Sequence, residues 1–506
     1  MQLGFVIDHS RCIGCHACTV ACKAENDVPL GSFRTWVKYT ERGAFPEVKR
    51  SFAVLRCNQC TDAPCVTICP VRALEKRSDG VVDVDPEACI GCKACMQGCP
   101  YDALYLNDST GTAQKCHFCV HRTELGLAPA CAVVCPTEAI VPGDFHDPES
   151  VVSRMRVEHD LRARKVEAGT GPNVLYREVE QAGIDPALAH ADAGYLWANR
   201  MPGVDLASEE ILAARDAAET RARTTYDVDH AARWGGKVSA YLLAKSVAAG
   251  AFLMVAVLAA ALGASTVSLV GLTISAMVFL GLTTVLLVAD LKRPERFLYI
   301  LLRPNWDSWL ARGGVVLAAY GAALALTLVA LHAPGPPLAL VVAVGVPLAM
   351  LTAAYTGWLF AQAKGRVLWM RRGLWLHLIV QALVAGAAFG LTLGPAIGLR
   401  GPAIPVLRLA LLVSLVLHAL FVLTEGRMAP RNREREYERA SVLVTRGPFA
   451  VRRWALGVGA GITAPAVLVL SSGSYLAGAA AGLLALAGLW IEDDTLVRAG
   501  QSLPIS

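Results

Sequence analysis

The amino-acid sequence predicts two parts of different fold class, an α+β domain built around cysteine-bound centres and an all-α bundle of eight membrane-spanning helices. All sixteen cysteines lie between Cys12 and Cys135, and none occurs in the remainder of the chain. The remainder contains long apolar runs, and apolar residues make up 54% of the chain, which is above the average of globular proteins. We therefore expect three regions, at residues 1–145, 146–235 and 236–506.

The sixteen cysteines fall into four sets of four. Two sets have the spacing C-x2-C-x2-C-x3-C, and the other two keep the x2 opening and the x3 closing around an insertion. A proline follows three of the sets, as in bacterial ferredoxins, where three thiolates of a set hold one cubane cluster and the fourth points to a neighbouring cluster. The pattern predicts an α+β double-ferredoxin iron-sulfur domain whose motifs work in pairs. The sets are Cys12, Cys15, Cys18 and Cys22; Cys57, Cys60, Cys65 and Cys69; Cys89, Cys92, Cys95 and Cys99; and Cys116, Cys119, Cys131 and Cys135.

Other uses of cysteine fit this pattern less well. Disulfides suit short secreted domains, whereas this chain is long and starts without a cleavable signal sequence. Structural zinc normally takes two C-x2-C pairs per ion, without the x2-x2-x3 run and its trailing proline. The segment from Cys12 to His16 also matches a haem-attachment pattern, but both of its cysteines already belong to the first set.

Charge argues against nucleic acid as a partner of the cysteine-rich domain. Residues 1–145 contain 14 Lys+Arg and 16 Asp+Glu, and they form no basic stripe. The segment at 146–235 is polar and helix-prone, with many charges at Arg154–Arg164 and much Ala, Glu and Arg at Asp205–Arg233. It has no catalytic constellation, and we expect a linker or docking segment with a solvated helical surface.

Eight apolar runs are long enough, or nearly so, to cross a bilayer. The loops on one side of these runs, at 290–312, 362–373 and 425–453, hold 17 Lys+Arg, whereas the opposite loops hold only Arg400. The positive-inside rule then places the basic loops, both termini and the cysteine-rich domain in the cytoplasm, with the protein in the inner membrane. The runs lie near 238–262, 266–289, 313–331, 337–361, 374–393, 404–424, 454–471 and 475–491.

Polar side chains inside the predicted spans indicate where a membrane cofactor binds. Lys245 and Tyr355 are each about 10 Å deep at ~1.5 Å per residue, so they can face one pocket. No histidine pairs have the helical spacing that haem b requires, and a quinone, either menaquinone or ubiquinone, is the natural electron partner. The candidate quinone-binding residues are Tyr241, Lys245, Asp290, Tyr355, His377 and His418, with Trp358, Gln381 and Glu425 at similar depths.

Residues 1–145 resemble the four-cluster ferredoxin subunits of molybdopterin oxidoreductases, which serve dimethyl sulfoxide, polysulfide and nitrite pathways. The resemblance rests on the segments Cys57-Asn-Gln-Cys60-Thr-Asp-Ala-Pro-Cys65, Cys89-Ile-Gly-Cys92-Lys-Ala-Cys95 and Cys116-His-Phe-Cys119, and on Pro129-Ala-Cys131. It implies four [4Fe-4S] clusters, with the first motif paired with the fourth and the second with the third. The implied ligand sets are Cys12, Cys15, Cys18 and Cys135; Cys116, Cys119, Cys131 and Cys22; Cys57, Cys60, Cys65 and Cys99; and Cys89, Cys92, Cys95 and Cys69.

Residues 236–506 resemble the NrfD-type membrane subunit of polysulfide reductase. The resemblance is clearest at Asp290-Leu-Lys-Arg-Pro-Glu-Arg-Phe297 and at Leu302-Arg-Pro-Asn305. It implies an eight-helix quinone-binding anchor without haem, whose quinone site lies at the cluster-facing end of the first four helices, the region of Tyr241, Lys245 and Tyr355. The family usually supplies the two parts as separate polypeptides, and many members face the periplasm.

Together these features predict an electron-transfer and membrane-anchor subunit that connects a separate cytoplasmic catalytic subunit, expected to be of the molybdopterin type, with the quinone pool. The chain itself has no signature of a substrate pocket, so the substrate chemistry is expected on the partner. Two alternatives stay open. One is an equivalent subunit of a hydrogenase or heterodisulfide-type complex, and the other is a redox-driven ion-translocating module.

Overall fold

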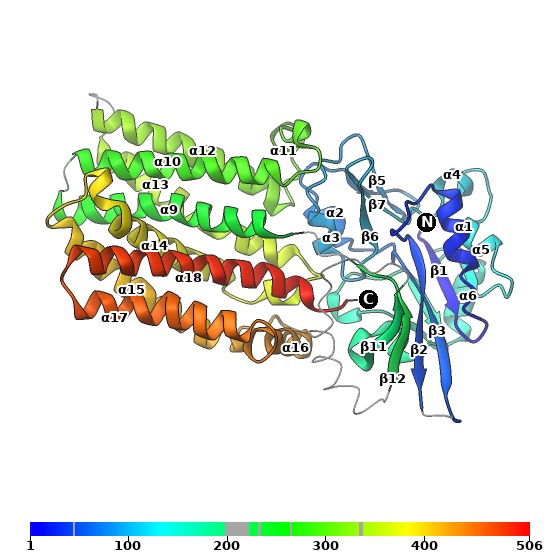
Figure 1. Ribbon diagram of the computed structural model, residues 1–506. Helices are drawn as coiled ribbons and strands as arrows, with labels where there is room; N and C mark the ends of the chain where they lie inside the picture. Colours follow the sequence, from blue (N-terminus) through cyan, green and yellow to red (C-terminus); the bar gives the residue numbers. More distant parts are fainter. Residues whose placement is uncertain (44–45, 198–221, 231–233, 264–265, 333–336, 506) are drawn as a thin grey trace. The chain divides into compact units, whose positions relative to one another are not determined.

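The computed structural model describes residues 1–43, 46–197, 222–230, 234–263, 266–332 and 337–505. These residues form two compact units, which Figure 1 colours along the sequence. The first unit contains Met1–Arg233 and the short segments Gln362–Arg366 and Gln501–Ser506, and the second contains Trp234–Ala361 and Val367–Gly500.

Two four-stranded sheets and two hairpins form the framework of the first unit. One sheet has the order β8-β1-β10-β9 and the other β11-β12-β2-β3, while β4 pairs with β5 and β6 with β7. In the core, Phe5 and Ile7 from the first sheet pack in one cluster with Trp36 and Val54 from the second. The strands are β1 (Leu3–Asp8), β2 (Thr35–Arg42), β3 (Lys49–Arg56), β4 (Leu74–Lys76), β5 (Val82–Val84), β6 (Leu104–Asn107), β7 (Thr112–Lys115), β8 (Ile140–Asp144), β9 (Leu161–Ala163), β10 (Val174–Arg177), β11 (Ala189–Trp197) and β12 (Ala222–Asp227).

The helices of the first unit are short, and four of them begin inside a cysteine motif. The third cysteine of every set is the second residue of its helix: Cys18 in α1, Cys65 in α2, Cys95 in α3 and Cys131 in α5. The helices are α1 (Ala17–Glu25), α2 (Pro64–Ile68), α3 (Ala94–Gly98), α4 (Val120–Thr123), α5 (Ala130–Val133), α6 (Val151–Glu158) and α7 (Gln181–Ile184).

The segment at 146–235 differs from the helical linker that its composition suggested. β10 pairs in parallel with β1, and β12 pairs antiparallel with β2, so this segment completes both sheets. The side chains of Val174 and Tyr176 are fully buried. The pairing joins residues far apart in sequence, and polar composition gives no sign of it. Most of Asp205–Arg233 lies outside the described residues.

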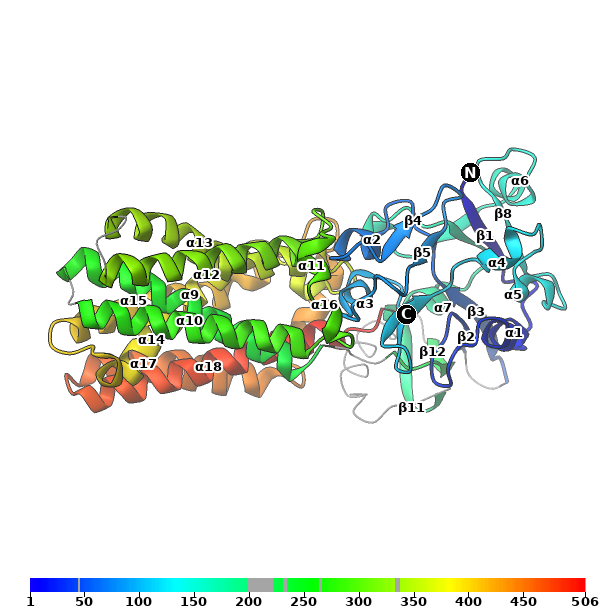
Figure 2. The same ribbon diagram turned by 90° about the horizontal axis from the view of Figure 1, so that it is seen from above.

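The second unit confirms the expected eight-helix bundle. Its described residues contain eight helices that are long and apolar enough to cross a membrane, and Figures 1 and 2 both show them running side by side. They are α9 (Gly236–Leu262), α10 (Thr266–Ala289), α12 (Trp309–His332), α13 (Leu338–Gln362), α14 (Leu374–Leu393), α15 (Ala403–Thr424), the pair η7 (Arg452–Thr463) and α17 (Ala464–Ser471), and α18 (Tyr475–Ser502).

Two details of the bundle differ from the sequence prediction. The seventh span begins as a π-helix, η7, before it continues as α17. The last span, α18, continues to Ser502, beyond the apolar run expected to end at residue 491. Its extension contains Glu492, Asp493 and Asp494, whose charges end the apolar run in the sequence but not the helix. Shorter helices, α11 (Tyr299–Leu302) and α16 (Glu434–Thr445), lie between the spans.

Glycines allow α9 and α14 to cross at very close range. A Cβ atom on Gly250 would lie 1.9 Å from the carbonyl oxygen of Ala382, and one on Gly386 would lie 2.1 Å from the carbonyl oxygen of Gly250. Both helices are buried along most of their length, so this crossing lies at the centre of the bundle. Small residues that let backbones approach are typical of helix interfaces in membranes.

We expect Gly250→Ala to destabilise the bundle by about 1–3 kcal/mol, because the added methyl group has to separate two packed backbones. The measurement is the melting temperature of the purified protein in detergent. Gly281→Ala in α10 is the matched control, since a Cβ atom there meets nothing within 4 Å. Equal melting temperatures for the two variants would contradict the close crossing.

Candidate functional site

The loops between the first cysteines of a set are wound through left-handed backbone conformations. Gly14 and Gly91, each directly before the second cysteine of its set, have φ of 71° and 66°. His16 and Lys93, directly after that cysteine, have φ of 60° and 65°. A Cβ atom on Gly14 would also lie 2.5 Å from the ring of Phe52, so both backbone conformation and space require glycine here. The tight loop then turns into a helix that carries the third cysteine.

The sixteen thiols are free, and electrostatic influence connects thiols of different cysteine sets. Burial and, after it, the neighbouring Cys57 thiol raise the pKa of Cys99 to about 12. Burial and the Cys69 thiol likewise raise the pKa of Cys92 to about 12. Cys135 is likewise an electrostatic neighbour of Cys12, Cys116 of Cys22, and Cys89 of Cys69, while Cys18 also has Cys131 and Cys95 also has Cys65 among its neighbours. We keep the word group for the four ligand sets expected from the resemblance, which are Cys12, Cys15, Cys18 and Cys135; Cys22, Cys116, Cys119 and Cys131; Cys57, Cys60, Cys65 and Cys99; and Cys69, Cys89, Cys92 and Cys95.

The donor set of each group suits an iron-sulfur cluster. Each group offers four soft sulfur donors, and thiolate sulfur is the ligand that holds [4Fe-4S] clusters. All sixteen cysteines lie in the described part of the chain, and none of them forms a disulfide there. Most of these thiols are buried, so negative charge on them is shielded from water and has to be balanced within the protein.

Two buried cations provide that balance. Arg56 donates from Nη1 to Sγ of Cys131 at 3.3 Å, and its guanidinium lies 4.3 Å from the ring centroid of Phe5. Lys115 donates from Nζ to the carbonyl oxygen of Cys116 at 2.6 Å. Burial alone would lower the pKa of Lys115, but nearby thiols, those of Cys57 and Cys116 first, give it a net rise. Both cations therefore favour negative charge on the sulfur atoms around them.

These two cations were missed in the sequence, although a signal for them exists. Arg56 directly precedes Cys57, and Lys115 directly precedes Cys116, so the second and fourth sets both open on a basic residue. The two residues end β3 and β7, which turns each cation into the domain interior beside the first cysteine of its set. Basic residues elsewhere in the domain are more often exposed, and composition alone does not separate the two classes.

In the membrane bundle, three of the candidate quinone-binding residues meet around one hydroxyl group. Lys245 on α9 donates from Nζ to Oγ1 of Thr356 at 2.6 Å and to the carbonyl oxygen of Ala353 at 2.9 Å. The hydroxyl groups of Tyr241 and Tyr355 also lie beside the hydroxyl group of Thr356. The Lys245 ammonium lies 4.9 Å from the ring centroid of Tyr355. We call Tyr241, Lys245, Tyr355 and Thr356 the lysine cluster.

Two further residues named from the sequence have different surroundings. Asp290 is one of the electrostatic neighbours of Tyr241, which connects it with the lysine cluster. Trp358 stacks between Trp309 and Trp375, with ring centroids 4.5 and 5.7 Å away. Its role in the described structure is to join α12, α13 and α14 through an aromatic stack.

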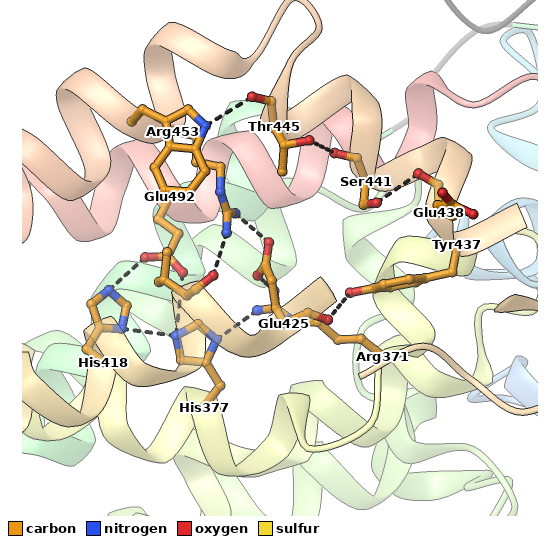
Figure 3. Close-up of polar contacts among 12 residues, drawn as sticks. Arg371, His377, His418, Glu425, Tyr437, Glu438, Ser441, Thr445, Arg453 and Glu492 are labelled. Carbon is orange, nitrogen blue, oxygen red and sulfur yellow. Dashed lines mark hydrogen bonds and ion pairs between the residues drawn. The ribbon is translucent and has the colours of Figure 1, made fainter. Parts of the chain in front are cut away.

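His377 and His418 form a second polar cluster, separate in its contacts from the first (Figure 3). Nε2 of His377 lies 3.0 Å from Nδ1 of His418, and Nε2 of His418 lies 2.7 Å from a carboxylate oxygen of Glu492. Arg371 lies 2.7 Å from Nδ1 of His377 and forms an ion pair with Glu425. We call His377, His418 and Glu492 the histidine cluster.

Buried arginines surround the carboxylates near the histidine cluster. Glu425 pairs with Arg371 and, at 2.5 Å, with Arg453. Burial lowers the pKa of Arg371, but its neighbours, Glu425 first, give it a net rise, so its guanidinium stays charged. A pocket lined by Arg371, Glu425, Arg453 and Glu492 adjoins the cluster and is partly open to the surface of the unit. Gln381, one turn along α14 from His377, has no side-chain partner for its Oε1 in the described structure.

The acidic residues of α18 were missed in the sequence because the apolar run was taken to end before them. Glu492 contacts His418, Asp493 is an electrostatic neighbour of Lys245, and Asp494 accepts a hydrogen bond from Ser239 at 3.0 Å. Three consecutive carboxylates next to an apolar run that can span a membrane are rare and costly. That triplet is the signal that points to them.

Comparison with known families matches both parts of the chain. Residues 48–145 match the model of the 4Fe-4S dicluster domain. Residues 227–504, more than half of the chain, match the model of the polysulphide reductase NrfD family.

Curated relatives match over a third or more of the chain and most of their own length. A tetrathionate reductase subunit from Salmonella typhimurium is 44% identical over 200 residues, which are 39% of this chain and 80% of the relative. A polysulfide reductase subunit from Wolinella succinogenes is 36% identical and covered to 98%, with 36% of this chain aligned. The iron-sulfur subunit ArrB of arsenate respiratory reductase from Shewanella sp. is 36% identical and covered to 96%, with 35% of this chain aligned.

Proposed function

Because this protein belongs to the polysulphide reductase NrfD family and carries a 4Fe-4S dicluster domain, we propose that it relays electrons between a separate catalytic subunit and quinone in the membrane. The observation that carries the proposal is the presence, in one chain, of four cysteine sets of four residues each and of a buried polar cluster among helices that can cross a membrane. The cysteines suit centres that store and transfer electrons, and the buried polar cluster suits the small polar head group of a ligand in an apolar setting.

The proposal assigns one [4Fe-4S] cluster to each thiol group, four clusters in all. When bound, the clusters supply one-electron redox centres, and the protein supplies the thiolates, the burial and the balancing charge. Arg56 and Lys115 favour the more negative, reduced state of the clusters beside them and so raise their reduction potentials. The catalytic partner is proposed to be a molybdopterin-type subunit, because the relatives are named as subunits of tetrathionate, polysulfide and arsenate reductases.

The lysine cluster is the proposed quinone site. The buried Lys245 donates two hydrogen bonds, to Thr356 and Ala353, and as an ammonium group it has a third hydrogen for a quinone carbonyl oxygen, while Tyr241 and Tyr355 are neighbouring hydroxyl donors. Such donors stabilise the charge that develops on a quinone oxygen during reduction. Either menaquinone or ubiquinone presents that oxygen. Asp290 is proposed as a residue at the edge of this site, through its interaction with Tyr241.

A second candidate function, ion translocation driven by the redox reaction, is favoured by one observation. The histidine cluster and the arginines beside it are ionisable groups buried in the membrane bundle. Among the described residues, their hydrogen bonds and ion pairs do not include the lysine cluster. Such groups in a membrane are costly and mark proton or ion pathways.

We expect the purified protein to bind about sixteen irons, four for each of four clusters. Cys95→Ala should remove one cluster's worth of iron and one set of signals from the low-temperature EPR spectrum of the reduced protein, because Cys95 is one of four thiols in its group. Met96→Leu is the control, since it changes the adjacent buried side chain without removing a sulfur ligand of the groups. About eight irons in the parent protein, or stoichiometric zinc, would contradict four clusters.

We expect Lys245→Met and Tyr355→Phe to slow quinone turnover by roughly tenfold or more, since each removes a donor worth about 1.5–3 kcal/mol to a charged oxygen. Reduction of the clusters by a soluble donor should stay as in the parent protein. Thr352→Val is the matched control on α13, because its buried hydroxyl has no partner in the described structure. Parent-like turnover in both variants would move the quinone site elsewhere.

The basic loops at 290–312, 362–373 and 425–453 support a cytoplasmic iron-sulfur domain. We expect a topology reporter fused after Ser506 to be active only in its cytoplasm-reporting form. An even number of spans puts both chain ends on one side, so the same reporter at the N-terminus should agree. Periplasmic activity at either end would reverse the orientation and the choice of partner.

A further inference from the structure

The histidine cluster has a fixed hydrogen-bond direction. Arginine has no acceptor and stays charged, so Arg371 can only donate to Nδ1 of His377. The hydrogen of the neutral His377 ring is therefore on Nε2, which lies 3.0 Å from Nδ1 of His418 and 3.5 Å from a carboxylate oxygen of Glu492, so the shorter hydrogen bond is donated to His418. The hydrogen of His418 is then on its Nε2 and is donated to Glu492. Both rings act as donor and acceptor at once, in a series of hydrogen bonds that ends on a carboxylate.

One ligand atom from each of His377, His418 and Glu492 lies within 4.8 Å of the others, a spacing that a metal ion could also bridge, but the hydrogen bonds between them favour proton transfer. A histidine that binds a metal points one ring nitrogen at the ion and its other nitrogen at a separate acceptor. His418 instead turns one nitrogen to His377 and the other to Glu492, so both of its nitrogens are used within the cluster (Figure 3). The guanidinium of Arg371 on His377 further disfavours a cation, because arginine supplies no acceptor.

The charges around the cluster balance when it holds no extra proton. Arg371 and Arg453 carry two positive charges, and Glu425 and Glu492 carry two negative charges. The next charged groups are matched among themselves, since Arg452 pairs with Asp494, and Asp493 interacts with Lys245. One added proton leaves a single positive charge, which the two imidazoles and Glu492 can share along their hydrogen bonds. The cluster can thus take up and release one proton without movement of a helix.

The cluster has two routes of exchange. The pocket lined by Arg371, Glu425, Arg453 and Glu492 is partly open to the surface of the unit, and Arg452 at its edge belongs to the basic loop at 425–453. On the other side, Asp493 follows Glu492 on α18 and interacts with it electrostatically, while it also interacts with Lys245. Oδ1 of Asp493 is buried and has no hydrogen-bond partner in the described structure, so it is available to a proton from a molecule bound at the lysine cluster.

We propose that His377, His418 and Glu492 form a proton-loading site that passes quinone protons between Asp493 and solvent. The proposal rests on the proposed quinone site at the lysine cluster. When a quinol is oxidised, its two O–H bonds break, and the iron-sulfur clusters, when bound, would supply the acceptors for its two electrons. Each proton goes in turn to the Asp493 carboxylate, then to Glu492 and the two histidines, and then to solvent. Quinone reduction uses the same steps in reverse.

His418→Gln tests the proposal, because an amide keeps a donor and an acceptor but cannot carry a proton. With ferricyanide as the electron acceptor, we expect quinol oxidation by the full chain in nanodiscs to fall roughly 10-fold to 100-fold in kcat, with KM unchanged, and proton release to a pH-indicating dye to slow equally. Glu492→Gln should behave alike. A solvent deuterium isotope effect should appear in both variants, since proton transfer becomes limiting, and a purely structural loss would not produce it.

His332→Gln is the matched control, since His332 is an exposed histidine whose Nδ1 contacts the carbonyl oxygen of Leu328 in its own helix. Parent-like kcat in folded His418→Gln and Glu492→Gln proteins would overturn the proposal. So would a stoichiometric metal other than iron that His418→Gln removes. Failure of the parent protein to oxidise quinol at all would instead overturn the proposed quinone function, which separates the two failures.

Discussion

Negative charge on sulfur, held in an interior that excludes water, is the condition on which the first unit depends. Sixteen thiols lie close together there, and burial alone makes their ionisation costly. Left-handed backbone conformations in the loops let three sulfur atoms of one cysteine set converge. The positive charges of Arg56 and Lys115 lie beside these thiols and reduce the cost of their ionisation. The two sheets then serve chiefly to hold these loops and cations in register.

The same condition recurs in the membrane bundle with different chemistry. Glu425 and Glu492 are carboxylates in an apolar setting, and Arg371, Arg453 and the two histidines compensate them. Removal of any one partner leaves a buried charge unpaired, which in proteins costs several kcal/mol. In a network whose charges are balanced in this way, one added proton changes the net charge of the buried groups from zero to one. The burial of these paired charges is therefore what makes the cluster suited to the proposed proton chemistry.

Sequence alone determined the features whose cause is local. Cysteine spacing revealed the motifs, because the spacing itself sets which sulfur atoms a tight loop can bring together. Long apolar runs revealed the eight spans, because bilayer thickness sets their length. Lys245 and Tyr355 were found from depth along their helices, and the structure does bring them to one hydroxyl group.

Only the tertiary structure decided the features that depend on distant partners. β10 and β12 were read as a polar linker because strand pairing with β1 and β2 leaves no mark in composition. Glu492 and Asp493 were left outside the last span, since their charges are tolerated only where His418 and Lys245 face them. The hydrogen-bond direction through the two histidines depends on Arg371, a loop residue whose contact with His377 no periodicity reveals. Local spacing fixes which groups a segment offers, and packing of distant segments fixes which charges can be buried.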